Sequence, residues 1–176
     1  MLEGKTVNLR IVEKEDLPLL SEWFNSPDFT GIYNPLVAQK SKRDIEKDYE
    51  KLGSEKAWFL ITKKDETRIG YMGMGLVGPY WEIGYVLIPN ERGKGYCTEA
   101  VQIVSDYLFM SKDIVRIQAT THMENVASQK ILEKAGFQRE GRIRKGMFAW
   151  GSWVDLYLYS ILREEWKEPK ILTKTA

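Results

Sequence analysis

Two glycines and two cations follow directly on an apolar strand near the middle of the chain, in the stretch Ile88-Pro-Asn-Glu-Arg-Gly-Lys-Gly-Tyr-Cys-Thr-Glu-Ala100. Gly93 and Gly95 allow the backbone to approach a ligand closely and to turn several N–H groups toward one point. The helical spacing that begins directly behind them adds unpaired N–H groups and the positive end of a helix dipole, and Arg92 and Lys94 add charge. The turn is therefore predicted to hold a phosphate or a pyrophosphate.

Size and composition predict one globular domain without metals or disulfides. The chain has 176 residues, 43% of them hydrophobic, and a formal net charge of +1. This balance does not favour a nucleic acid or a membrane surface as a partner. One cysteine, Cys97, and one histidine, His122, cannot form an internal disulfide or a common zinc site. No apolar run resembles a signal core or is long enough to span a bilayer, so the expected location is cytoplasmic.

The elements that must position the turn follow from hydrophobic periodicity and from turn residues. The expected strands are residues 7–12, 57–62, 68–77, 81–88, 115–121, 137–145 and 153–162. The expected helices are residues 16–24, 41–52, 98–110 and 126–134. The order β-α-α-β-β-β-α-β-α-β-β fits a mixed α/β sheet with helices on both faces. Residues 1–166 are expected to form the domain, and residues 167–176 a polar tail that frays.

Three motifs accompany this order of elements. They are Arg92-Gly-Lys-Gly95-Tyr-Cys97, then Asn125-Val-Ala-Ser128 with Leu132-Glu-Lys-Ala-Gly-Phe137 behind it, and Trp81-Glu-Ile-Gly-Tyr85 on the preceding strand. Together they resemble the GNAT family of N-acetyltransferases, most closely the RimJ/RimL-like branch that acetylates the N-termini of ribosomal proteins. The likeness implies the GNAT acyl-CoA N-acyltransferase fold, with a mostly antiparallel sheet. Cys97 departs from the glycine or alanine of the family pattern, but it is also small.

The resemblance implies acetyl-CoA as cosubstrate and no metal. The pantetheine arm would lie where the strand before the turn splays from its neighbour, with its amides paired to the backbone of Leu87 and Ile88. The N–H group of Leu87 would stabilise the oxyanion of the thioester carbonyl. Asn125 would cap the following helix and contact the arm. The residues expected to bind the pyrophosphate and the adjoining arm are Arg92, Gly93, Lys94, Gly95, Tyr96, Cys97 and Thr98.

The resemblance also suggests two catalytic residues. Ser128 matches a serine that would protonate or hydrogen-bond the CoA sulfur, whereas the tyrosine of many relatives is Leu132 here. A carboxylate proposed as the base in this branch falls on Met147, which cannot accept a proton. Glu82, on the strand before the turn, is the remaining candidate for deprotonating the acceptor, directly or through water. The alternative for Glu82 is an exposed strand glutamate without a catalytic role. Cys97 is expected to serve as a small residue and not as a nucleophile.

The acceptor is expected to be an amine, in particular the N-terminal α-amino group of a ribosomal protein or other peptide. It would lie between the N-terminal helices and the last hairpin, beside a basic cluster of Arg142, Arg144 and Lys145 that disfavours a polycation. Two alternatives remain, namely a catalytically silent acyl-CoA-binding regulatory module and a polyamine or antibiotic acetyltransferase. A dinucleotide-binding oxidoreductase is disfavoured because Thr98 occupies the place of the third glycine. A homodimer is consistent with the apolar strands near the C-terminus.

Overall fold

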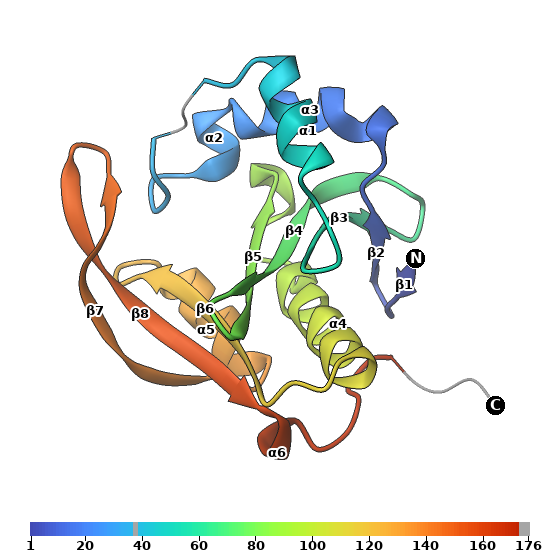
Figure 1. Cartoon of the computed structure of the whole chain (residues 1–176), viewed down its shortest axis with the longest axis vertical. Helices are drawn as coiled ribbons and strands as arrows, with labels where there is room; N and C mark the ends of the chain where they lie inside the picture. Colours follow the sequence, from blue (N-terminus) through green and yellow to red (C-terminus); the bar gives the residue numbers. More distant parts are fainter. Residues whose placement is uncertain (37–38, 173–176) are drawn as a thin grey trace.

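The computed structural model describes residues 1–36 and 39–172 and contains one eight-stranded sheet with the order β1-β2-β3-β4-β5-β6-β8-β7 (Figure 1). The strands are β1 (Leu2–Glu3), β2 (Val7–Ile11), β3 (Lys56–Lys63), β4 (Arg68–Val77), β5 (Tyr80–Leu87), β6 (Arg116–His122), β7 (Gln138–Ala149) and β8 (Ser152–Leu162). The helices are α1 (Leu17–Phe24), α2 (Pro27–Thr30), α3 (Lys42–Glu50), α4 (Tyr96–Ser111), α5 (Val126–Lys134) and α6 (Arg163–Trp166). Among the strand pairs of the described residues, β5 and β6 alone run parallel, so the predicted mixed and mostly antiparallel sheet is confirmed.

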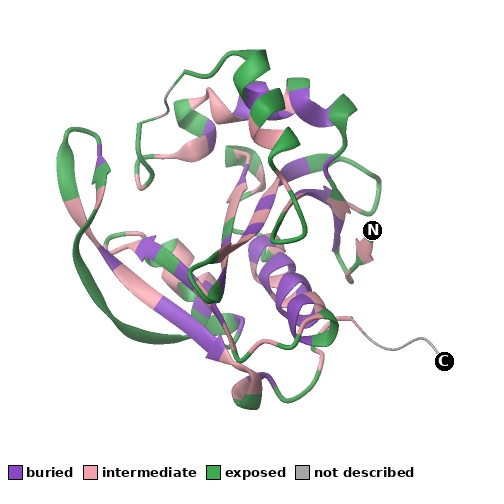
Figure 2. Cartoon of the chain, in the orientation of Figure 1, coloured by how far each residue is buried: buried purple, intermediate pink, exposed green. Residues whose placement is uncertain are grey.

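Helices cover both faces of the sheet. Successive strand residues point to opposite sides, so each face has apolar side chains that a helix can bury. Phe59 and Ile61 of β3 pack into the larger core, which includes buried residues of α4 and α5. Leu60, between them, packs into a second core with Leu20 of α1 and Ile45 of α3. Figure 2 shows α4 as the most continuously buried helix, whereas α3 presents an exposed outer face. The larger core holds α4 and α5 against one face of the sheet, and the second core holds α1 and α3 against the other.

Several boundaries differ from the sequence prediction. Helix α4 begins at Tyr96, two residues earlier than expected, because Gly95 adopts a left-handed φ of 86° and lets the helix start directly behind it. Strand β7 extends to Ala149, and the hairpin turns at Trp150 and Gly151, which both have positive φ. The sequence patterns also miss the short elements β1, α2 and α6. The β7–β8 hairpin therefore extends well beyond the body of the sheet (Figure 1).

The segment after α6 is docked, which corrects the expectation that it frays. Asp106 of α4 is fully buried, and its carboxylate accepts hydrogen bonds from the backbone N–H groups of Lys170, Ile171 and Leu172 at 2.7–3.0 Å. The indole N–H of Trp166 donates to the same carboxylate at 2.8 Å. A buried carboxylate requires such partners, so the polar composition of the segment gave a wrong expectation for residues 167–172. Residues 173–176 lie outside the described part.

None of the helices in the described residues combines the length and the apolar character needed to cross a bilayer.

Candidate active site

Strands β5 and β6 are paired only at their first residues. Trp81 pairs with Ile117 and Glu82 with Gln118, and the two strands separate beyond this point. β5 continues along β4 as far as Leu87, while β6 continues along β8 as far as His122. The separation opens a gap in the middle of the sheet, as the GNAT resemblance predicts. Each strand keeps its outer neighbour, so the gap exists without any loss of the sheet on either side.

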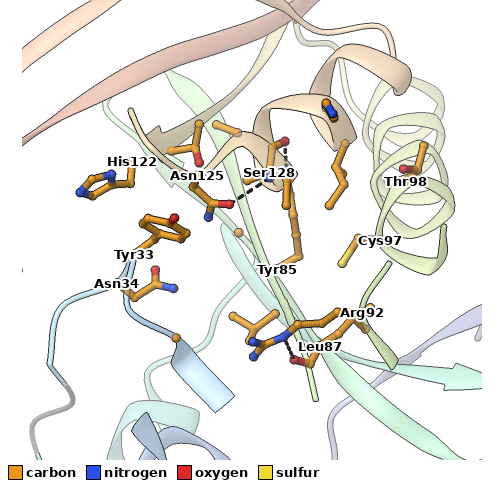
Figure 3. A pocket seen from close by; sticks show the side chains of 18 of the residues that line it. Tyr33, Asn34, Tyr85, Leu87, Arg92, Cys97, Thr98, His122, Asn125 and Ser128 are labelled. Atoms are coloured by element: carbon orange, nitrogen blue, oxygen red, sulfur yellow. Dashed lines mark hydrogen bonds between the residues drawn. The ribbon is translucent and has the colours of Figure 1, made fainter. Parts of the chain in front are cut away.

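A cavity of about 550 Å³ fills this gap (Figure 3). Its size is typical of a small-molecule or cofactor site. It is lined by β5, the glycine turn, the start of α4, the end of β6, α5, the segment after α2 and the β7–β8 hairpin. The basic side chains of the lining are Arg92, His122, Lys130 and Lys134, and the described lining contains no carboxylate. The cavity therefore favours anionic or neutral groups.

The glycine turn has the geometry of an anion site. Gly93 and Gly95 have φ values of 78° and 86°, and a Cβ atom on either would meet no atom within 4 Å. The backbone N–H groups of residues 93–98 have no acceptor within the described ranges 1–36 and 39–172. Gly93, Gly95 and the first three residues of α4 line the cavity. Unpaired N–H groups at the positive end of a sixteen-residue helix suit a pyrophosphate.

The two cations of the turn are bound to the protein itself. The Arg92 Nε donates to the carbonyl of Leu87 at 3.0 Å, and its Nη2 donates to the carbonyl of Phe29 at 2.8 Å. Arg92 therefore fastens α2 to the end of β5, and it still lines the cavity. The Lys94 ammonium lies 2.9 Å from a Glu91 carboxylate oxygen, and Lys94 is outside the lining. Each cation is thus partly engaged by the protein, whereas the backbone N–H groups of residues 93–98 have no such partner in the described residues.

The expected role of Ile88 requires a correction. Its N–H donates to the carbonyl of Ile69 in β4 at 2.9 Å, and its own carbonyl accepts from Glu91 at 3.1 Å. The N–H of Ile88 is therefore not left for the pantetheine arm, and Ile88 does not line the cavity. Backbone groups alternate in direction along a strand, so the N–H of Leu87 points away from β4 and toward the gap. Leu87 lines the cavity and remains suitable for the predicted contact with the thioester carbonyl.

Ser128 and Asn125 lie together at the start of α5. The Asn125 Oδ1 accepts a hydrogen bond from the Ser128 N–H at 3.1 Å, which caps the helix. The Ser128 hydroxyl lies 3.0 Å from the phenol oxygen of Tyr85, which reaches it from β5 (Figure 3). Tyr85 is the last residue of the third sequence motif, but it is not among the expected site residues. The available signal is strand alternation, which places Tyr85 on the same face as Ile83 and Leu87.

The remaining expected proton donors and acceptors lie in different environments. Glu82 accepts a hydrogen bond from Gln118 at 3.0 Å, at the closed end of the gap, and it does not line the cavity. Met147 lines the cavity, whereas Leu132 is fully buried in the larger core. Burial raises the pKa of the Cys97 thiol to about 12, with a smaller opposing effect of Arg92. Cys97 therefore remains a thiol near neutral pH, which disfavours nucleophilic action.

The outer end of the cavity is formed by side chains from distant segments. Tyr33, from the segment after α2, lies beside His122 at the end of β6, and Asn34 follows Tyr33 in the lining (Figure 3). The rings of Tyr33 and His122 have centroids 5.2 Å apart. The His122 Nδ1 accepts a hydrogen bond from the Glu124 N–H at 3.0 Å, which places the proton of the neutral ring on Nε2. This end can therefore offer hydrogen-bond donors and an aromatic surface to an acceptor.

The described residues contain no group of three or more histidine, cysteine, aspartate or glutamate side chains arranged to hold a metal ion.

A splayed pair of parallel strands beside an anion-binding turn is what the class of acyl-CoA-dependent N-acyltransferases requires. Residues 6–138 match the family of acetyltransferase (GNAT) domains, and the chain belongs to this family of N-acetyltransferases. The chain is 33% identical over 173 residues to N-acetyltransferase p20 of Bacillus licheniformis, a protein described as uncharacterized, with 94% of this chain and 97% of that protein covered.

Two solved structures share the fold at low sequence identity. The spermidine N-acetyltransferase of Vibrio cholerae, in complex with CoA and spermine, has a TM-score of 0.81 at 20% identity, over 93% of this chain and 99% of that chain. RimL, a ribosomal L7/L12 alpha-N-protein acetyltransferase in complex with coenzyme A, has a TM-score of 0.79 at 18% identity, over 92% and 97%. The amine acceptors named for these two proteins differ, so the shared fold does not identify the acceptor.

Proposed function

We propose that the chain moves an acetyl group from acetyl-CoA to the N-terminal α-amino group of a protein or peptide, as in the RimJ/RimL-like branch. The observation that carries this choice of acceptor is the charge of the cavity. Its described lining has Arg92, Lys130 and Lys134 but no carboxylate. A polyamine or an aminoglycoside keeps other ammonium groups when one amine reacts, and these would lie unpaired beside like charges. A peptide N-terminus brings a single amine followed by neutral amides.

The pKa of the acceptor leads to the same choice. An amine must be neutral to attack, and at pH 7 this costs about 4.6 kcal/mol for a lysine side chain but only about 1.1 kcal/mol for an α-amino group. A site without a carboxylate in its described lining is better matched to the smaller cost. Deprotonation by Glu82 is proposed to occur through water, because its carboxylate lies at the closed end of the gap. An unchanged pH–rate profile in Glu82→Gln would remove that role.

The residues of the cavity divide the reaction between them. The N–H groups of residues 93–98 would hold the pyrophosphate, and the pantetheine arm would follow β5 into the gap. The N–H of Leu87 would stabilise negative charge on the thioester oxygen. The amine nitrogen would form its bond to the carbonyl carbon, and the C–S bond would break with its electron pair on sulfur. The Ser128 hydroxyl would hydrogen-bond that sulfur.

A panel of acceptors tests this proposal. Release of free CoA thiol is measured with peptides beginning with Ser or Ala, with the same peptides blocked at the N-terminus but carrying a lysine, with spermidine and with an aminoglycoside. Unblocked peptides are expected to react at least about tenfold faster than the others, equivalent to ~1.4 kcal/mol. Faster turnover of spermidine would overturn the choice of acceptor. Binding of CoA without thiol release on the whole panel would favour the silent regulatory module.

A further inference from the structure

Two hydroxyl groups meet inside the cavity from opposite walls. The phenol oxygen of Tyr85, on β5, lies 3.0 Å from the hydroxyl oxygen of Ser128, on α5. The Ser128 N–H is already bound to Asn125 at 3.1 Å. The backbone of Ser128 is therefore held by the helix cap, and its side chain is held by a phenol from the other side of the gap. Both side chains line the same cavity (Figure 3).

Either hydroxyl can donate in this pair, and the phenol oxygen of Tyr85 also lies 3.4 Å from the Ser128 carbonyl oxygen. Burial raises the pKa of Tyr85 far above its ordinary value, and the hydrogen bond with Ser128 offsets only part of that effect. The phenol stays protonated, and it has a proton to donate. When Tyr85 donates to the Ser128 oxygen, the proton of Ser128 is left free for a third group. The place of the tyrosine found in many relatives is occupied by Leu132, which is fully buried.

We propose that Tyr85 is a positioning residue that turns the Ser128 hydroxyl proton toward the departing CoA sulfur, an inference that rests on the proposed acetyl transfer. When the C–S bond breaks, its electron pair remains on sulfur, and the Ser128 O–H donates a hydrogen bond to that thiolate. The nitrogen loses one proton to water and the sulfur gains one from water, so the two hydroxyl groups are unchanged at the end. Without Tyr85, the Ser128 hydroxyl is free to rotate toward a helix carbonyl.

The first test needs only bound CoA. The pKa of the bound CoA thiol is measured from the ultraviolet absorbance of the thiolate in wild type, Ser128→Ala, Tyr85→Phe and Tyr159→Phe. Tyr159 is the matched control, because its buried phenol also joins a strand to α5, at 3.0 Å from Glu133, but lies outside the cavity lining. The thiol pKa is expected to rise by about one unit in Ser128→Ala and in Tyr85→Phe but not in the control. A wild-type value in Tyr85→Phe would overturn the proposal.

The second test is a double-mutant cycle on kcat with an accepted peptide. Tyr85→Phe is expected to lower kcat about tenfold with little change in the KM of acetyl-CoA. If Tyr85 acts through Ser128, the double variant has the kcat of Ser128→Ala alone. Two losses that multiply, or an equal loss in Tyr159→Phe, would contradict the positioning role. If the wild-type protein binds CoA and lowers the pKa of its thiol but acetylates no amine, the proposed function is contradicted and the positioning role of Tyr85 is not.

Discussion

In the proposed reaction, the two halves of the cavity would recognise their ligands in different ways. The cofactor side would depend on backbone N–H groups of six consecutive residues, 93–98, together with one helix end. The acceptor side would depend on side chains such as Tyr33, His122 and Met147, which come from three separate segments. Backbone recognition needs only glycines and a helix start, so a short motif reveals it. Side-chain recognition is assembled by the tertiary structure, and a short motif does not reveal it.

The largest expected effect tests the cofactor side. Gly95→Val adds a β-branched side chain where open space adjoins the turn and where φ is 86°. CoA affinity is expected to fall by about 100-fold or more, as if two charge-assisted hydrogen bonds were lost. The matched control is Gly78→Val, in the β4–β5 turn, which carries the same left-handed strain at a φ of 59° but lies outside the cavity lining.

Titration calorimetry with CoA separates the two variants. The control is expected to lose stability, as Gly95→Val does, while it keeps wild-type CoA affinity. Unchanged affinity in Gly95→Val would show that residues 93–98 do not bind the pyrophosphate, and the contrast between the two halves would fail.

The second effect tests the acceptor side by adding the missing carboxylate. Met147→Glu places a negative charge in a lining whose described charged groups are all basic. The kcat/KM of spermidine is expected to rise about tenfold, the equivalent of ~1.4 kcal/mol from a partly buried charge pair. The KM of acetyl-CoA is expected to stay near the wild-type value.

Phe148→Glu is the control for this change. Phe148 is the next residue of β7, and it is 52% exposed and outside the lining. An equal gain for spermidine in both variants would mean that the charge acts over the surface and not within the cavity. The acceptor side would then lose its role in specificity.

A smaller effect is expected from the contacts of Asp155 with Lys145 and Arg142, here called the brace, which shape the β7–β8 hairpin. The Lys145 N–H donates to Asp155 at 2.8 Å, and Arg142 forms an ion pair with the same carboxylate. Lys145 has a φ of 52°, and the strand register shifts between Ile143 and Met147. Asp155 thereby stabilises the bulge that precedes Met147. Asp155→Asn is expected to raise the KM of the peptide acceptor about threefold without changing that of acetyl-CoA.

The pH dependence of this brace follows from the pKa of Asp155. The backbone hydrogen bond from Lys145 and then the side chain of Arg142 hold that pKa below its ordinary value of 3.8. The brace is therefore complete above that ordinary value and is lost only as pH falls through the lowered pKa. The KM difference between Asp155→Asn and wild type should be constant across neutral pH. Glu140→Gln, at the other end of β7, is the control, and an equal KM change there would contradict a local role.

The smallest effect is expected at Cys97. Its thiol is buried, with a pKa raised to about 12, and the family pattern has glycine or alanine at this position. Cys97→Ala is expected to leave kcat within about twofold of wild type, in line with a conservative change of a small side chain. Mass spectrometry after reaction with acetyl-CoA should find no acetyl group on Cys97. A trapped acetyl-cysteine together with a large loss of kcat would replace direct transfer by a covalent route.

The sequence by itself determined the family, the order of the longer elements and the position of the glycine turn. These follow from local properties, namely the periodicity of apolar residues and the need for glycine at positive φ in Gly93 and Gly95. The splay of β5 from β6 was also available, but only through the family resemblance. Local reasoning assigned the docked residues 167–172 to a fraying tail, because nothing nearby in the sequence indicates that Asp106 is buried.

Only the tertiary structure decided which side chains share the cavity. Tyr85 contacts Ser128, and Tyr33 approaches His122, although the partners are far apart in the chain. The lack of a carboxylate in the described lining also depends on which distant segments form the cavity. A sequence motif also cannot indicate that the N–H of Ile88 is bound to β4 and that its carbonyl accepts from Glu91. Backbone conformation is specified by the local sequence, whereas the residues that a side chain contacts depend on how distant elements pack.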